Sequence, residues 1–261
     1  MCAQARLFYK LHSSNYLLSL GRYGSKMLLL GIVVTHLSGC GEPKTKDLKI
    51  SFQIESSPNI EQTSATLYFY DGTQELILDK ATLSIKAKGI AQTMLKHDSR
   101  STKSYSASFD FSNTNEMFTL SIFRADYEDA PNTFVTGPSP VVINSPLDQS
   151  TQDGNAAYEL QWSPSIEGES LDYWTLIYCQ HPTNGITEWK ASRDEKLIPD
   201  TGTYTIDFSA WFIQESIAPE WQCNAQTWLA RETQGTLDPA LNPNGNAIAR
   251  YFHVISYDIS H

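Results

Sequence analysis

The chain has 261 residues, of which 18% are charged and 11% aromatic, and its formal net charge is −10. This composition favours a folded, β-rich protein over a disordered one. The first 39 residues contain four basic residues and no acidic ones, so the remainder, with 15 basic and 29 acidic residues, has a net charge of −14. An acidic body repels phosphate backbones, which argues against nucleic acid as a partner.

An apolar run from Met27 to Leu37 is the first distinct element. Its 11 residues are too few for a membrane-spanning helix, which needs about 20. A basic segment precedes the run and the small residues Ser38 and Gly39 follow it, which is typical of a secretory signal. The sequence therefore predicts export, with Cys40 directly after the signal.

Leu37-Ser38-Gly39-Cys40 resembles the bacterial lipobox. The resemblance implies that residues 1–39 are a lipoprotein signal peptide and that Cys40 becomes the acylated amino terminus, carrying chains such as palmitate. It also implies the outer membrane of a Gram-negative envelope, because Gly41 stands where an aspartate would retain the protein at the inner membrane. Several acyl chains anchor a protein stably, so the lipid bilayer is one expected partner. The alternative is a plain signal peptide with an incidental cysteine, or a buried strand. The periplasmic or surface orientation stays open.

Residues 40–47 read as a short lipidated tether, and a period-two pattern follows them. Leu48 to Glu55 places four apolar side chains on one face, and Tyr105 to Phe111 and Met117 to Arg124 repeat the pattern. Asp71-Gly72 predicts a turn between two further β-rich runs. Turn-forming residues recur about every ten residues, which is typical of a β-sandwich. The sequence thus predicts a first β-sandwich domain over residues 48–145.

A proline-rich segment, Val135 to Asn155, follows this domain. Proline cannot donate to a strand ladder, so the segment reads as an edge strand leading into a linker, with the boundary at 145/146. Strand-like runs then cover residues 158–165, 172–180, 202–208, 221–235 and 246–259. Asp207 to Ser216 suggests one short helix. Residues 146–261 are predicted to form a second β-sandwich.

The second domain resembles an immunoglobulin-like or fibronectin type III sandwich in its Trp162-Ser163-Pro164 run and in Trp221-Gln222-Cys223-Asn224-Ala225. The resemblance implies an all-β protein of two consecutive sandwiches, with Trp162 in the core and Trp221 near the corner-tyrosine position of such folds. It also implies that Cys179 ends the third strand and that Cys223 lies in the sixth, its neighbour in one sheet. The whole layout resembles uncharacterised two-domain lipoproteins of gammaproteobacteria, which brings no known activity with it.

The cysteine count points to one disulfide. Cys2 precedes the apolar run and Cys40 ends it, which leaves Cys179 and Cys223 in the body. Two cysteines in an exported body suit a single disulfide, and a loop of about 44 residues would stabilise the fold by about 3–4 kcal/mol. Two unpaired buried thiols are the alternative. A redox pair is disfavoured because the Cys-x-x-Cys spacing is absent.

Arg124 and Arg231 each end a strand-like run that continues into an acidic or polar turn. The two arginines are candidates for equivalent positions in two related sandwiches. Chance similarity between strand ends is the alternative.

Motifs for catalysis or metal binding are weak. The part after Cys40 has four dispersed histidines without ligand spacing, each expected to be solvated, and no Gly-x-Ser-x-Gly elbow. The acidic turn Asp126 to Asp129 and the loop residues Asp238, Asn242 and Asn244 are weak calcium candidates, with solvated loops as the default interpretation. We expect no catalytic residue, no cofactor and no other metal site.

Tryptophans and tyrosines are in excess in the second domain. Those within strands are expected mostly in the core, whereas Trp189 and Trp211 lie near turn-like segments and are candidates for exposed binding aromatics. Exposed aromatic rings stack on sugars or anchor a protein partner. Core packing is the alternative for both residues.

Together these features favour an envelope lipoprotein acting as a non-enzymatic binding or assembly module for an unknown envelope protein or glycan. Two alternatives from other classes stay open. One is an envelope enzyme or glycan-binding protein whose site is assembled from distant residues, and the other is a pure structural spacer.

Overall fold

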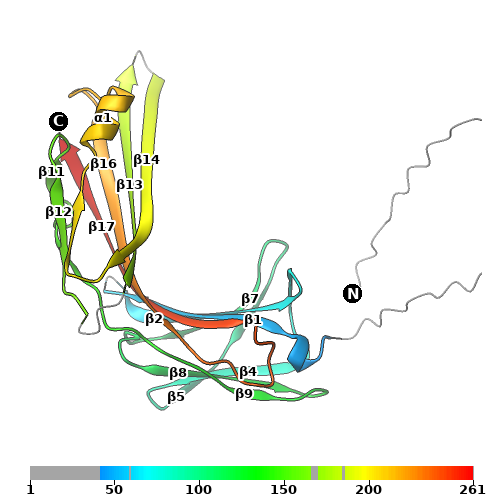
Figure 1. Cartoon of the computed structure of the whole chain (residues 1–261). Helices are drawn as coiled ribbons and strands as arrows, with labels where there is room; N and C mark the ends of the chain where they lie inside the picture. Colours follow the sequence, from blue (N-terminus) through cyan, green and yellow to red (C-terminus); the bar gives the residue numbers. More distant parts are fainter. Residues whose placement is uncertain (1–41, 59, 166–169, 184–185, 261) are drawn as a thin grey trace, which may run out of the picture. The chain divides into compact units, whose positions relative to one another are not determined.

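Strands dominate the computed structural model, which describes residues 42–260 except 59, 166–169 and 184–185 (Figure 1). Residues Pro43–His261 form one compact unit. The predicted lipidation site, Cys40, and the signal segment lie outside the described residues. The expected all-β class is confirmed.

The first sandwich is built from two layers of strands. One layer has the order β1-β2-β7-β6, with the short β3 paired to β2, and the other has the order β5-β4-β8-β9. The strands of the first layer are β1 (Lys49–Ser57), β2 (Ile60–Asp71), β3 (Gln74–Leu76), β6 (Leu95–Asp98) and β7 (Lys103–Phe109). The strands of the second layer are β4 (Ala81–Ala87), β5 (Ile90–Thr93), β8 (Met117–Arg124) and β9 (Ala130–Thr136).

Alternating burial explains why these segments form strands. In β1 the apolar residues predicted to share a face are fully buried, and in β8 Phe118, Leu120 and Ile122 are buried in the same alternating way. Successive side chains of a strand point to opposite faces, so this pattern turns one face of each sheet toward the core. The predicted Asp71-Gly72 turn joins β2 to β3, and Gly72 adopts φ +61, a backbone region that glycine enters without strain.

The second sandwich also has two layers. One is the three-stranded sheet β10-β12-β15, and the other has the order β14-β13-β16-β17, with the short β11 paired in parallel to the end of β17. The strands of the smaller layer are β10 (Ile143–Ser145), β12 (Tyr158–Trp162) and β15 (Thr203–Ile206). The other strands are β11 (Thr151–Asp153), β13 (Ser170–Thr183), β14 (Ile186–Pro199), β16 (Gln222–Gln234) and β17 (Asn246–Ser260). The helix α1 (Ser209–Glu215) is the short helix predicted from the sequence.

Strand β17 belongs to both sandwiches. Its residues from Asn246 to Tyr251 pair in parallel with β1, while its residues from Ile248 to Ile259 pair antiparallel with β16 (Figure 1). With 15 residues, β17 is much longer than the usual strand of about 5–6 residues, so it can extend beyond the second sandwich. Ala247 and Ala249 of β17, together with Leu241 of the preceding loop, pack in the first hydrophobic core. The boundary predicted at 145/146 placed all three in the second domain.

The amino-terminal end of the described chain is folded against the first sandwich. Residues 43–47 are part of the segment expected to be a polar tether, yet they include a 3-10 turn, η1 (Thr45–Asp47). Thr45 is buried, its hydroxyl donates to the Glu128 carbonyl at 2.5 Å, and the Arg124 guanidinium donates to the Pro43 carbonyl at 2.8 Å. The polar composition of this segment predicts none of these long-range contacts.

Candidate functional site

The outer face of the β14-β13-β16-β17 sheet carries the most concentrated set of chemically distinctive side chains. Burial alternates along β13, so Tyr173, Thr175, Ile177 and Cys179 are buried while Trp174 and Tyr178 face outward. The strand register then aligns outward-facing residues in rows across the sheet. Four such rows run Glu195-Trp174-Trp228-Val254, Arg193-Leu176-Gln226-Ser256, Ala191-Tyr178-Asn224-Asp258 and Trp189-Gln180-Gln222.

An aromatic ladder crosses this face. The rings of Trp174 and Trp228 stack with centroids 6.3 Å apart, and Phe252 lies 5.9 Å beyond Trp228. The Arg193 guanidinium lies 5.4 Å from the Trp174 ring, within the range of a cation–π contact. These strand tryptophans were expected in the core, but their outward position leaves them partly exposed, each ring shielded by its neighbours.

A hollow of about 600 Å³ lies on the same face, toward the carboxyl end of β17. We call it the amide hollow, because amide and hydroxyl side chains form much of its lining. The lining residues are Thr151, Tyr178, Gln180, Trp221, Gln222, Cys223, Asn224, Asp258, Ile259 and Ser260. Asn224 Nδ2 donates to Asp258 Oδ1 at 3.2 Å, and Gln180 Nε2 donates to Gln222 Oε1 at 3.4 Å. A carboxamide has two N–H donors and a two-lone-pair oxygen, so each pair keeps further hydrogen-bonding capacity.

The two predicted binding aromatics lie in different surroundings. Trp189 is 60% exposed, and its ring lies 6.4 Å from that of Tyr178, which is 38% exposed and lines the amide hollow. Trp211 is on α1, packs partly buried against the second core and contacts the Phe212 ring at 5.3 Å. Tyr178 was not predicted as a binding residue from the sequence. It could have been found, because side chains alternate along a strand and its neighbour Cys179 was expected to point inward.

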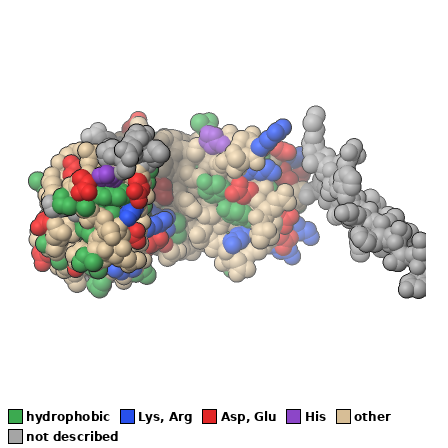
Figure 2. Space-filling model, turned by 90° about the horizontal axis from the view of Figure 1, so that it is seen from above, with side chains coloured by type: hydrophobic (Ala, Val, Ile, Leu, Met, Phe, Trp, Pro, Cys, Tyr) green, Lys and Arg blue, Asp and Glu red, His purple; other side chains and the backbone are tan. Residues whose placement is uncertain are grey.

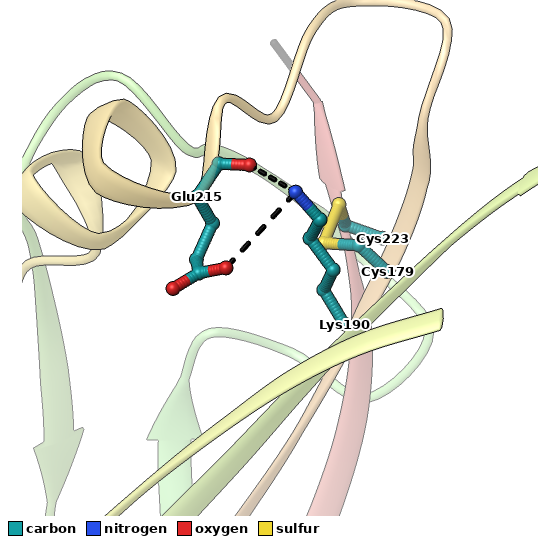
Figure 3. The surroundings of a disulfide bond; sticks show 4 residues. All are labelled: Cys179, Lys190, Glu215 and Cys223. Atoms are coloured by element: carbon teal, nitrogen blue, oxygen red, sulfur yellow. Dashed lines mark hydrogen bonds and ion pairs between the residues drawn. A yellow bond between two sulfur atoms is a disulfide. The ribbon is translucent and has the colours of Figure 1, made fainter. Parts of the chain in front are cut away.

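The Cys179–Cys223 disulfide is present, and it lies on the inner side of the sheet beneath the amide hollow. The two cysteines are directly opposite on β13 and β16, as expected for neighbouring strands. Figure 3 shows Lys190 of β14 reaching past this bond to the end of α1, where its ammonium donates to the Glu215 carbonyl. A cation at a helix carboxyl end is favourable. The same ammonium lies 5.1 Å from the ring of Trp221, which packs partly buried against the second core on this side of the sheet.

A buried ion pair lies at the other end of the second sandwich. Asp200 accepts hydrogen bonds from Arg231 Nε at 2.8 Å, Trp162 Nε1 at 2.7 Å and the Ser165 backbone amide at 3.0 Å. Burial alone would raise the pKa of Asp200, but the hydrogen bonds and the positive charge of Arg231 outweigh it and hold that pKa below its ordinary value. Trp162 is 3% exposed, so the predicted core position is confirmed.

Arg124 and Arg231 occupy corresponding places in the two sandwiches. Each is buried near the carboxyl end of a strand, β8 or β16. Each guanidinium donates to the carbonyl of a proline that precedes the first strand of its sandwich, Pro43 or Pro140. The similarity that the sequence suggested therefore has a structural counterpart. Each arginine thus attaches the segment that precedes the first strand to its own sandwich, and neither contributes to the outer face.

The calcium candidates Asp238 and Asn242 accept hydrogen bonds from backbone amides. The two carboxylate oxygens of Asp238 accept from the backbone amides of Asn132 and Ala240, and Asn242 Oδ1 accepts from the Asn244 amide. Asp238 also lines a hollow of about 330 Å³ with Glu128 and Asp129. Within the described residues there is no group of three or more His, Cys, Asp or Glu side chains placed to hold a metal ion.

His253 differs from the expected solvated histidine. It is half-buried on β17, and its Nδ1 accepts the Ile143 backbone amide at 2.8 Å, which attaches β10 to β17. Burial lowers the pKa of His253, and the nearby Asp148 carboxylate opposes this effect. An imidazole that must accept a hydrogen bond at Nδ1 is best kept neutral.

The distribution of charged side chains argues against a nucleic-acid partner and against strand addition at the β14 edge. In Figure 2, Lys and Arg side chains are interspersed with Asp and Glu on the visible face, without a large basic patch. The edge strand β14 carries the ion pairs Arg193–Glu195 and Lys196–Asp194, and charged side chains on an edge discourage strand addition.

Among the described residues, no helix is long and apolar enough to span a bilayer.

No family model and no curated protein matches the chain. Among solved structures, the chain is similar to the FN1–FN3 domains of chicken CNTN1 (16% identity over 80% of this chain and 65% of that one, TM-score 0.21). It is also similar to a two-domain fibronectin type III segment of chicken tenascin (10% identity over 83% of this chain and 98% of that one, TM-score 0.22). A DUF4785 family protein of Legionella pneumophila is similar as well (8% identity over 69% of this chain and 52% of that one, TM-score 0.27). The chain thus spans less than two thirds of the CNTN1 and DUF4785 chains. The immunoglobulin-like, fibronectin type III-like fold is seen in the strand order of each sandwich.

Proposed function

We propose that this protein is a lipid-anchored envelope lipoprotein that acts as a non-enzymatic binding module through the outer face of its second sandwich. The observation that carries the binding role is the conjunction of the amide hollow with the exposed Tyr178–Trp189 pair. Recognition surfaces characteristically combine exposed aromatic rings with polar side chains that can form further hydrogen bonds. The anchoring role rests on the Met27–Cys40 segment of the sequence.

The folded amino terminus supports a close attachment to the membrane. If Cys40 is acylated, only Gly41 and Glu42 separate it from Pro43, which Arg124 holds against the first sandwich. The three extended Cα–Cα steps from Cys40 to Pro43 span about 10–11 Å. The first sandwich would then lie directly on the bilayer, and the second sandwich would present the binding face.

Metabolic labelling tests the anchor. Radiolabelled palmitate is expected to enter the wild-type chain and to be absent from the Cys40→Ala variant, because the acylated thiol is lost. Cys2→Ala is the control, since Cys2 would leave with the signal peptide. Equal labelling of the Cys40→Ala variant would refute the lipidation proposal.

Sedimentation with isolated envelopes tests the binding face. The soluble chain 41–261, which contains the compact unit Pro43–His261, is expected to sediment with envelopes from a strain lacking the protein. Combined Tyr178→Ala and Trp189→Ala substitutions should reduce the bound fraction at least tenfold. Phe123→Ala, which removes an exposed aromatic ring from the first sandwich, is the matched control. Equal binding by the double variant and the wild type would refute this assignment of the face.

A further inference from the structure

We propose that the amide hollow is a saccharide-binding site that takes one or two units of a neutral glycan chain. This inference rests on the proposed binding function and names its ligand class. The relevant features are the chemistry of the lining, the regular spacing of its polar groups, the aromatic border and the size.

The lining excludes anionic ligands and favours neutral polar ones. It offers the side-chain amides of Gln180, Gln222 and Asn224 and one carboxylate, Asp258, and contains no Lys or Arg. A site for phosphate, sulfate or an acidic sugar would need a cationic donor to offset the carboxylate. Amides and a carboxylate instead match hydroxyl groups, which donate and accept at the same time.

The strand register spaces these groups evenly. Tyr178, Asn224 and Asp258 lie in one row across β13, β16 and β17, while Gln180 and Gln222 form the next row. Neighbouring strands are about 4.8 Å apart, and alternate residues along a strand are about 6.8 Å apart. Several hydroxyl groups of one sugar ring can therefore meet different side chains of this grid. In the sequence these residues are far apart, between positions 178 and 258.

The aromatic border supplies the second element of sugar recognition. Tyr178 lines the hollow, and the exposed Trp189 ring, 6.4 Å from that of Tyr178, extends the aromatic surface beyond it. The C–H groups of a sugar ring carry partial positive charge and pack against the negative face of an aromatic ring.

The dimensions suit a short oligosaccharide segment. A volume of about 600 Å³ lies within the range of roughly 300–1,000 Å³ that is usual for small-molecule sites. The hollow opens to solvent on the sheet face, so a longer chain can continue past Trp189.

Calorimetric titration of the soluble chain 41–261 tests this proposal. The probes are tetrasaccharides of β-1,4-linked N-acetylglucosamine, β-1,4-linked glucose and α-1,4-linked glucose, with a sulfated heparin tetrasaccharide as the anionic comparison. At least one neutral probe is expected to bind more tightly than the sulfated one. Tyr178→Ala and Asn224→Ala should each weaken that binding about tenfold, the effect of one lost contact of about 1.4 kcal/mol.

Further variants separate folding from recognition. Gln222→Ala removes an exposed amide from the hollow without touching the core and should also weaken binding severalfold. Phe123→Ala should bind as the wild type does. The proposal is overturned if no neutral probe binds, if the sulfated probe binds best, or if Arg193→Ala alone abolishes binding, which would place the ligand at the aromatic ladder. Loss of envelope sedimentation by the Tyr178 and Trp189 variant without any saccharide binding would retain the binding face and point to a protein partner instead.

Discussion

Replacing Asp200 with asparagine removes the charge that compensates the buried guanidinium of Arg231. The side chains of Arg231 and Asp200 are 3% and 0% exposed, so water cannot replace the lost interaction. Both Asp200 oxygens accept hydrogen bonds, Oδ1 from Trp162 and Oδ2 from Ser165 and Arg231. An asparagine keeps one acceptor and turns an N–H₂ group toward donors at the other position. Breaking a buried ion pair typically costs about 3–5 kcal/mol, and we expect a loss of that size.

Urea unfolding followed by tryptophan fluorescence measures this loss. All six tryptophans lie between residues 162 and 228, so the signal reports on the second sandwich. At pH 7 the Asp200→Asn variant should unfold at a lower urea concentration, with an unchanged slope. Glu232→Gln is the matched control, because Glu232 follows Arg231 on β16 and forms a partly exposed pair with Arg250 at 2.7 Å. Such a pair contributes at most about 1 kcal/mol.

A double-mutant cycle identifies the cause of the loss. Arg231→Met alone leaves Asp200 buried without its cation, whereas the double variant removes both charges. We expect the double variant to lose at least about 1 kcal/mol less than the sum of the single variants, because contacting residues are energetically coupled. An Asp200→Asn loss no larger than that of Glu232→Gln, or strictly additive losses, would refute the interpretation of this pair as a buried, mutually compensating one.

Three further outcomes are expected in urea unfolding. The Cys179→Ser and Cys223→Ser double variant should lose about 4 kcal/mol, since the disulfide closes a loop with a sequence separation of 44; a loss below about 1 kcal/mol would contradict this. Burial lowers the pKa of His253 in the folded state, so below about pH 6.5 the unfolded chain binds more protons than the folded one. The free energy of unfolding should therefore be highest above about pH 6.5 and fall as the pH is lowered. His253→Asn should flatten that dependence. Asn113→Ala should cost about 1–3 kcal/mol, because buried Asn113 joins Ser56 to the Arg250 carbonyl. Because Asn113 lies in the first sandwich, its unfolding is followed by far-UV circular dichroism, and a wild-type urea midpoint would exclude such a role.

Local patterns in the sequence predict several features of the fold because their causes are local. Alternation of apolar and polar residues is set by the two-residue repeat of a strand, so the buried faces of β1, β7 and β8 follow from the sequence. The disulfide follows from counting, because only two cysteines remain after Cys40. The same alternation also marks Trp174 and Trp228 as outward-facing, although apolar character alone favours the core for them.

Contacts between distant segments explain the differences from the expected layout. Residues 43–47 have a polar composition, yet Arg124, about 80 residues later, supplies the partner that orders them. Strand β17 pairs with β1 nearly 200 residues away, and nothing within Asn246–Tyr251 reveals that pairing. Trp211 lies near a turn, but α1 directs it against the second core.

The sequence by itself determined the all-β class, the inward and outward parity of the strands and the cysteine pair, because each depends on residue type and spacing along the chain. Only the tertiary structure decided which outward-facing residues meet. Tyr178, Asn224 and Asp258 come from three separate strands, and the register of β13, β16 and β17 brings them into one row at the amide hollow. A shift of one residue in any of these strands would turn its member of the row toward the core. The candidate site is therefore a property of strand pairing.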